Sequence, residues 1–175
     1  MKLKITALFI VLLSISVLFA KQVPVDLARN LSKNLYFERI NQIETKKLSD
    51  IHLNHIYTEI HQNKAVYYVF NVNQNEGFVI LSADDIAKPV IGYSFHGKYD
   101  PGNLPPSFEF FIGKHRDAIV YGLENNLKAN DDIEQAWHHL AEISETNLRN
   151  IKTLTPLLLT TWGQSCYYNA MCPES

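Results

Sequence analysis

The first candidates for covalent chemistry are Cys166 and Cys172, two cysteines in a sequence of 175 residues. In an oxidising compartment they could pair as a disulfide, and either one could instead act as a nucleophile. A thiol attacks as the thiolate, which requires a cationic neighbour or a base that lowers the thiol pKa. No cationic residue lies within several positions of either cysteine, and Glu174 would raise the pKa of a nearby thiol. We therefore predict that neither cysteine is a nucleophile, while their pairing stays open.

Seven histidines are the next candidates, for metal binding or acid–base chemistry. His52 and His55 are three positions apart, so on a strand they would point to opposite faces, whereas on a helix they could share a metal. We find no Asp, Glu or Cys at ligand spacing that would complete such a site. His138 and His139 are adjacent, so their side chains diverge, and His96 and His115 are isolated. The sequence predicts solvated or core histidines and no metal site.

Asp84 and Asp85 are adjacent carboxylates, a residue type that glycoside hydrolysis uses in pairs. That chemistry needs carboxyl groups about 5 to 10 Å apart across a cleft, normally supplied by separate elements. Adjacent Asp residues in a turn more often bond the turn backbone and cap the next element. The sequence also has no Gly-rich phosphate loop, no G-x-S-x-G motif and no basic stripe interleaved with aromatics. The residues alone therefore predict no catalytic residue, no cofactor and no nucleic-acid partner.

An uncharged apolar stretch runs from Ile5 to Ala20, after Lys2 and Lys4. A basic start, an apolar run and a small residue at a plausible cleavage point predict a secretory signal peptide over residues 1–20. A retained membrane anchor is the alternative, but a stable span needs about 20 apolar residues. We expect a secreted or periplasmic protein that makes no membrane contact after signal cleavage.

The rest of the chain has the composition of one ordinary globular domain. Loss of Lys2 and Lys4 with the signal reduces 16 basic residues to 14, against 18 acidic residues, for a formal net charge of −4. Such a balance excludes a basic nucleic-acid-binding domain. A content of 46% hydrophobic residues excludes a disordered polar tail, and two cysteines exclude a disulfide-dense scaffold.

Runs of β-branched and aromatic residues predict strands at the centre of the chain. They extend from Ile51 to Ile60, from Ala65 to Val72, from Gly77 to Ser82 and from Pro89 to Phe95. The polar residues 73–76 join the second and third runs, which is typical of a β-hairpin. The sequence therefore predicts an antiparallel meander of three or four short strands.

Apolar residues at a spacing of three to four predict amphipathic helices on either side of these strands. The helices are expected from Val25 to Asn41, from Pro106 to about Asn125, and from Asp131 to Ile143. The predicted fold class is α+β, with a small antiparallel sheet of three to four strands packed against amphipathic helices. From Ile151 onward the sequence has neither a helical nor a strand period.

Two stretches resemble one protein family. From Tyr67 to Tyr93 the motifs Y-Y-V-F-N-V, G-F-V-I-L-S-A-D-D and P-V-I-G-Y are similar to the prodomain of streptopain-family cysteine peptidases and to free inhibitors of the Spi type. The tail P-L-L-L-T-T-W-G-Q-S-C-Y-Y-N-A-M-C-P resembles the segment that opens the mature protease, where W-x-Q-x-x-P-Y-N-x-x-C-P is common. Tyr167 stands where the family often has Pro.

The resemblance implies a domain organisation and a set of motif positions, but no catalytic residue. After the signal peptide predicted at 1–20, it implies a Spi-like prodomain at 21–150 and a linker with the start of the protease domain at 151–175. In the family the nucleophilic Cys lies further on in a T-G-C-V-A-T-A-like segment and the His lies beyond it, whereas this sequence ends at Ser175. We interpret the family-motif residues as structural: Gly77, Phe78, Ser82, Asp84, Asp85, Pro89, Gly92, Tyr93, Trp162, Gln164, Tyr168, Asn169, Cys172 and Pro173, with a possible disulfide between Cys166 and Cys172.

The function implied is that of an exported, catalytically inactive prodomain that docks on a streptopain-like cysteine protease, in cis or in trans, and covers its substrate cleft. We expect the processing cut in the linker, near residues 150–153, because unpacked linkers are accessible to proteases. One alternative is the truncated front of a zymogen with no independent role, which the tail from Trp162 favours. Another is a surface or periplasmic module that binds a glycan or peptide through exposed members of its 20 aromatic residues, although aromatic-rich strands are more often core.

Overall fold

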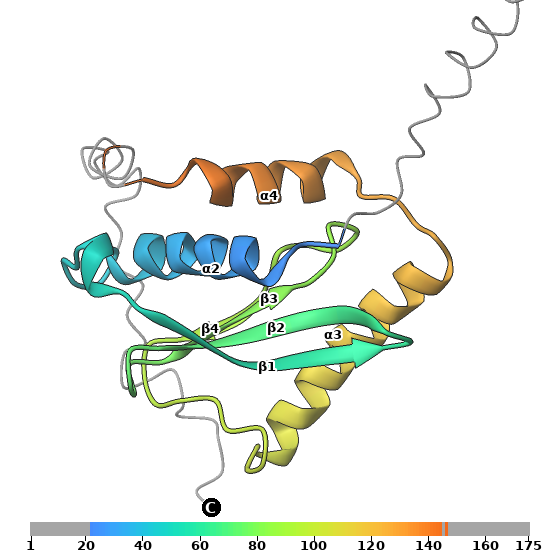
Figure 1. Ribbon diagram of the computed structural model, residues 1–175, viewed down its shortest axis with the longest axis horizontal. Helices are drawn as coiled ribbons and strands as arrows, with labels where there is room; N and C mark the ends of the chain where they lie inside the picture. The colour runs from blue at the N-terminus through green and yellow to red at the C-terminus, as the bar shows by residue number, and fades with distance from the viewer. Residues whose placement is uncertain (1–21, 145, 147–175) are drawn as a thin grey trace, which may run out of the picture.

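The computed structural model describes residues 22–144 and 146, and in this part of the chain one antiparallel sheet has helices on both faces (Figure 1). The predicted α+β class is confirmed. The elements in chain order are α2 (Val25–Ile40), a short 3-10 helix η1 (Leu48–Asp50), β1 (Leu53–His61), β2 (Lys64–Val72), β3 (Phe78–Ser82), β4 (Val90–Ser94), α3 (Pro106–Glu124) and α4 (Asp131–Glu142).

The four strands form a meander in the order β1-β2-β3-β4, as the sequence predicts. In the β2–β3 hairpin Tyr67 is opposite Ser82, and Phe70 is opposite Val79. The edge strand β1 has two irregularities in its register, next to Tyr57 and next to Ile60. Such bulges disrupt the pairing edge and hinder association with another strand.

The two central strands are buried on both faces, which explains why their sequences are almost continuously apolar rather than alternating. Tyr68 and Phe70 of β2 belong to the core beneath α2, whereas Val69 belongs to the core beneath α3. In β3, Leu81 belongs to the core beneath α2 and Ile80 to the core beneath α3. The sheet is therefore the middle layer of three.

Helices α2 and α4 share one face of the sheet, where α4 lies against α2 (Figure 1). Helix α2 buries Leu35 and Tyr36 completely, with 0% and 1% of their surface exposed. The side chain of Asn130 accepts a hydrogen bond from the backbone N–H of Ile133 and so caps the start of α4. Leu140 of α4 completes the core on this face.

Helix α3 covers the opposite face, where Ile112 and Ile119 are buried against the sheet. Gly122 lets the helix approach the β3–β4 connection closely, because a Cβ atom there would lie 3.3 Å from the side chain of Ile86. Within residues 22–144, no helix is long and apolar enough to cross a membrane.

The observed bounds differ from the predicted ones by one residue at several ends. Helix α2 ends at Ile40, and Asn41 is its C-terminal cap. Strand β4 begins after Pro89, which lacks the N–H that a ladder position would need. Helix η1 was not expected, because a single 3-10 turn is too short to produce a periodic apolar pattern.

Candidate functional site

Three connecting segments meet at one end of the sheet. They are residues 50–54 at the start of β1, the β2–β3 turn 73–76, and the loop 95–105 that leads from β4 to α3. The backbone N–H of Gly77 donates to the carbonyl of Gly97 over 2.8 Å, which joins the turn to the loop. This end of the sheet is where the chain has both exposed loops and a pocket.

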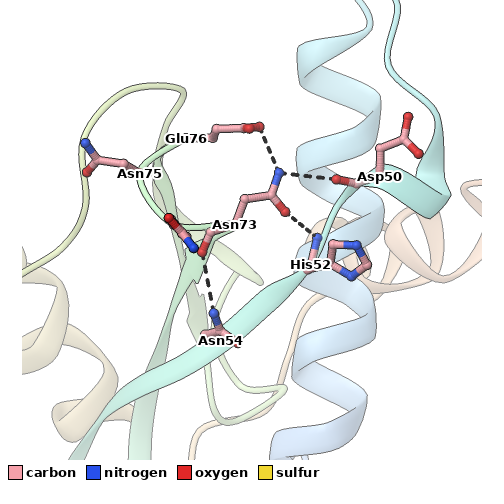
Figure 2. A pocket seen from close by; sticks show the side chains of 7 residues that line it. Asp50, His52, Asn54, Asn73, Asn75 and Glu76 are labelled. Carbon is pink, nitrogen blue, oxygen red and sulfur yellow. Dashed lines mark hydrogen bonds between the residues drawn. The ribbon is translucent and has the colours of Figure 1, made fainter.

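The pocket has a volume of about 610 Å³ and is lined by residues with polar side chains, which Figure 2 shows from close by. Its centre is the side chain of Asn73, whose backbone is in the left-handed region with φ +48°. The Asn73 Oδ1 accepts from the His52 backbone N–H at 2.9 Å, and its Nδ2 donates to the Asp50 carbonyl and to Glu76. The seven lining residues are Asp50, His52, Asn54, Asn73, Gln74, Asn75 and Glu76.

The acidic member of this turn, Glu76, is held in its charged form. Lys46 pairs with the Glu76 carboxylate, and this contact together with the Asn73 amide lowers the pKa of Glu76. The Tyr36 hydroxyl donates to the Glu76 carbonyl at 2.6 Å, and burial raises the pKa of Tyr36 to about 12, with further contributions from Glu76 and Glu44. The pocket can accept and donate hydrogen bonds, and its described lining contains no hydroxyl or thiol nucleophile.

Beyond Gly97, the loop 95–105 is anchored at Tyr99, which is only 4% exposed. Its backbone N–H donates to Asn71 Oδ1 at 2.8 Å, and Asn71 Nδ2 donates back to the Tyr99 carbonyl at 3.1 Å. The Tyr99 ring makes edge-to-face contacts with Phe78 and Phe108. The buried Tyr99 ring and two hydrogen bonds from the Asn71 side chain to the Tyr99 backbone thus fix the middle of the loop to the sheet.

The residues after Tyr99 form an exposed tip, 100–103, before the chain enters α3. Asp100 organises this tip, because its Oδ1 accepts from the Gly102 N–H and its carbonyl accepts from the Asn103 N–H, both at 3.1 Å. Pro105 and Pro106 then start the helix. The tip is short, internally hydrogen-bonded and bounded by rigid residues on both sides.

The first half of α3, next to this loop, carries exposed aromatic side chains. Phe110 is 68% exposed and Phe111 is 41% exposed. The Lys114 ammonium lies 5.3 Å from the centre of the Phe110 ring, and the His115 ring meets the Phe111 ring edge-to-face with ring centres 4.6 Å apart. Tyr121, near the far end of α3, is 62% exposed. An exposed cluster of large apolar side chains is typical of an interaction surface.

The first group of sequence-predicted motif residues lies in β3 and the turn after it. Gly77 has φ +108°, and the Phe78 ring contacts Tyr99 edge-to-face. The Ser82 hydroxyl is buried and donates to the Asp84 carbonyl at 2.9 Å. Asp84 is 1% exposed, and its carboxylate accepts from the Ile86 N–H at 3.1 Å and from the Gln22 amide at 3.0 Å. Asp84 therefore bonds the turn backbone, as predicted for a carboxylate in this position.

The second group lies in and before β4. Pro89 is fully buried, and its carbonyl accepts from the Ser82 N–H at 2.8 Å. Gly92 lies beneath Phe111, and Tyr93 is 41% exposed on the other face of the strand. The remaining predicted positions lie outside the described residues: Trp162, Gln164, Cys166, Tyr168, Asn169, Cys172 and Pro173.

The histidines are dispersed over the described part of the chain. His55 is on β1 and packs against Phe70 with ring centres 5.4 Å apart, while His52 precedes the strand. His138 faces Glu142, and His139 contacts Glu38 at 2.8 Å. Within residues 22–144 and 146, no group of three or more His, Cys, Asp or Glu side chains could hold a metal ion.

Sequence reasoning missed the residues that organise this end of the sheet. Asn71 falls inside a predicted strand, and Asn73 falls inside a predicted turn, so each has an ordinary local explanation. Tyr99 did carry a signal, because it is an aromatic residue in an otherwise Pro- and Gly-rich connection. Nothing in the sequence indicates that Tyr99 pairs with Asn71, 28 positions earlier.

Comparisons with known proteins identify a family and one relative for this chain. A model of the Spi protease inhibitor family matches residues 20–119, which includes α2, all four strands and most of α3. The chain is also 25% identical over 170 residues to the thiol protease/hemagglutinin PrtT of Porphyromonas gingivalis. That likeness covers 94% of this chain, so it continues past residue 119 through α4, but the chain spans only about a fifth (19%) of PrtT. No solved structure matches the chain. The chain belongs to the Spi protease inhibitor family.

Proposed function

We propose that this protein is an exported inhibitory domain that docks on a streptopain-like cysteine protease and covers its substrate cleft. The observation that carries the proposal is the family match over residues 20–119, because these residues contain the complete sheet and the exposed loop at its end. The likeness to a thiol protease along nearly the whole chain supports a protease as the partner. We propose that the domain has no catalytic activity of its own.

The surface proposed to contact the protease is the loop tip 100–103 together with Phe110 and Phe111. The tip is exposed but held in one conformation by the anchor at Tyr99, so it would lose little conformational entropy on binding. Exposed aromatic rings beside it supply apolar area, and aromatic side chains are frequent among the residues that dominate interface energies. A cleft that normally accepts an extended substrate could accommodate such a narrow tip.

The domain could act on a protease in the same polypeptide or on a separate one. A short flexible linker holds a tethered domain at an effective concentration of about 1 mM. A dissociation constant of about 0.1 mM would then leave roughly 90% of the protease blocked, whereas a separate inhibitor needs a smaller value. We propose processing of a precursor in the linker near residues 150–153. Mass spectrometry that found the cut inside 65–93 would exclude this position.

The proposal is tested by adding purified residues 21–175 to the active protease of PrtT and measuring the rate of peptide hydrolysis. We expect saturable inhibition, and no hydrolysis by the chain alone. Phe110→Ala should weaken inhibition about 10-fold, in the range of a single interface aromatic. Tyr121→Ala is the matched control, because it is similarly exposed on the same helix but about 16 Å further along it. Equal inhibition by both variants would contradict the proposed surface.

The alternative of a glycan- or peptide-binding module rests on the same exposed rings. Most aromatic side chains on the strands are core, including Tyr67, Tyr68 and Phe70, which leaves few for a binding platform. Saturable glycan binding together with full protease activity in the presence of the chain would favour that alternative.

A further inference from the structure

We infer that Asn71 and Tyr99 are positioning residues that set the inhibitory loop in its docking conformation. This inference rests on the proposed function, and it assigns to these two residues the role of holding the loop 95–105 in the conformation that binds the protease. Neither side chain would need to touch the protease, because Tyr99 is buried and Asn71 lies on β2 behind the loop.

The contact between the two residues is a closed pair of hydrogen bonds. Asn71 Oδ1 accepts from the Tyr99 N–H at 2.8 Å, and Asn71 Nδ2 donates to the Tyr99 carbonyl at 3.1 Å. The amide side chain therefore binds the loop backbone as a neighbouring strand would. Asn71 is itself fixed, since it is paired with Asn54 on β1 and with Phe78 on β3.

The Tyr99 side chain adds a second set of contacts to the hydrogen bonds that Asn71 makes with the Tyr99 backbone. It contacts Phe78 and Phe108 with ring centres 5.8 and 6.0 Å away, and Tyr57 at 6.2 Å. It shares a buried cluster with Tyr67 of β2, and burial raises the pKa of Tyr99. The ring thus joins the loop to β1, β2, β3 and α3 at once.

The location of this anchor in the sequence gives it a specific consequence. Tyr99 immediately precedes the exposed tip 100–103, whose other end is fixed by Pro105 and Pro106 at the start of α3. Release of Tyr99 would free the tip at its N-terminal side only, while the sheet and helices keep their own contacts. The unbound loop would then sample many conformations, and the binding-competent fraction would fall, which raises the apparent inhibition constant in proportion.

The experiment compares Asn71→Ala with Trp137→Phe as the matched control in the chain of residues 21–175. Each change removes hydrogen bonds from a side chain to a backbone group, but the Trp137 indole bonds the Ala87 carbonyl, outside the loop. We expect Asn71→Ala to raise the inhibition constant 10- to 100-fold, as expected for two hydrogen bonds. Trp137→Phe should leave the inhibition constant within about threefold, although it lowers the unfolding midpoint. Tyr99→Phe keeps the ring and both backbone bonds, so it should also stay within about threefold.

A second readout separates the anchor from the inhibition that it is proposed to support. In hydrogen exchange on the free domain, the Tyr99 amide should be protected in the wild-type chain and exchange at least about 10-fold faster in Asn71→Ala. If the wild-type chain inhibits but Asn71→Ala inhibits equally well, the positioning role is wrong and the proposed function stands. If the wild-type chain does not inhibit, the proposed function fails regardless of the exchange result. An unprotected wild-type Tyr99 amide would overturn the anchor itself.

Discussion

Trp137 and Ala87 join helix α4 to the β3–β4 connection through one hydrogen bond, in which the indole Nε1 donates to the Ala87 carbonyl over 2.9 Å. Trp137 belongs to α4, which lies beyond the residues matched by the Spi family model. A second bond in the same region runs from the Asn34 amide on α2 to the Leu140 carbonyl at 2.9 Å. Helix α4 is therefore part of the folded domain, even though the family match ends within α3.

Truncating the buried side chain of Leu140 on α4 should destabilise the whole domain. Leu140 is 2% exposed in the core beneath α2, so Leu140→Ala is expected to lower the free energy of unfolding by about 2–5 kcal/mol. Leu127→Ala is the control, because Leu127 is 47% exposed and its truncation should change stability by less than about 0.5 kcal/mol. Urea titration monitored by circular dichroism measures both. Equal effects would mean that α4 is not packed as described.

Gly77 and Gly97 allow a test of the backbone at the end of the sheet where the turn 73–76 meets the loop 95–105. Both have positive φ, but a Cβ atom on Gly77 would lie 1.9 Å from the Ser94 carbonyl oxygen, whereas one on Gly97 would meet nothing within 4 Å. Gly97→Ala should therefore show only the cost of the left-handed conformation, about 1–2 kcal/mol. Gly77→Ala should be destabilised by about 4 kcal/mol or fail to fold, since a backbone clash is added. Similar unfolding midpoints for the two variants would refute this difference.

The buried tyrosines should make the fold sensitive to alkali. Burial raises the pKa of Tyr36 from 10.0 to about 12, and the hydrogen bond to Glu59 is the main cause that raises the pKa of Tyr57 to about 12. Because the folded pKa lies above the unfolded one, this stabilisation is complete below pH 10 and is lost as the pH rises toward 12. For Tyr36 alone, stability should fall by about 1.4 kcal/mol per pH unit in that window. A free energy of unfolding that stays constant between about pH 10 and pH 11 would contradict the prediction.

The secondary structure could be predicted because each element has a strong local signal. The four strands have dense β-branched and aromatic runs, and the helices have regular apolar spacing, with starts predicted at Val25, Pro106 and Asp131. The meander order also follows from the sequence, because short polar connections favour pairing of consecutive strands. The division of helices between the two faces did not follow, since β2 and β3 are apolar on both sides.

The candidate site could be predicted only in part. The family motifs include Gly77, Phe78 and Asp84, which the structure places in β3 and the turns on either side of it. The anchor itself depends on a contact between residues 71 and 99, and a pairing across 28 positions leaves no local pattern. The sequence also did not predict that Phe110 is exposed, because Phe110 is one of several aromatic residues near the start of α3.

The central claim is that the folded domain blocks a cysteine protease, and the most direct test is the inhibition constant of residues 21–175 against the active protease of PrtT. We predict a constant of about 0.1 mM or smaller, which is the value that a tethered domain needs to keep a protease mostly silent. The chain should survive the assay intact, and Phe110→Ala should inhibit less well than Tyr121→Ala. Undiminished peptide hydrolysis in the presence of about 1 mM chain, or rapid digestion of the chain as a substrate, would contradict the account.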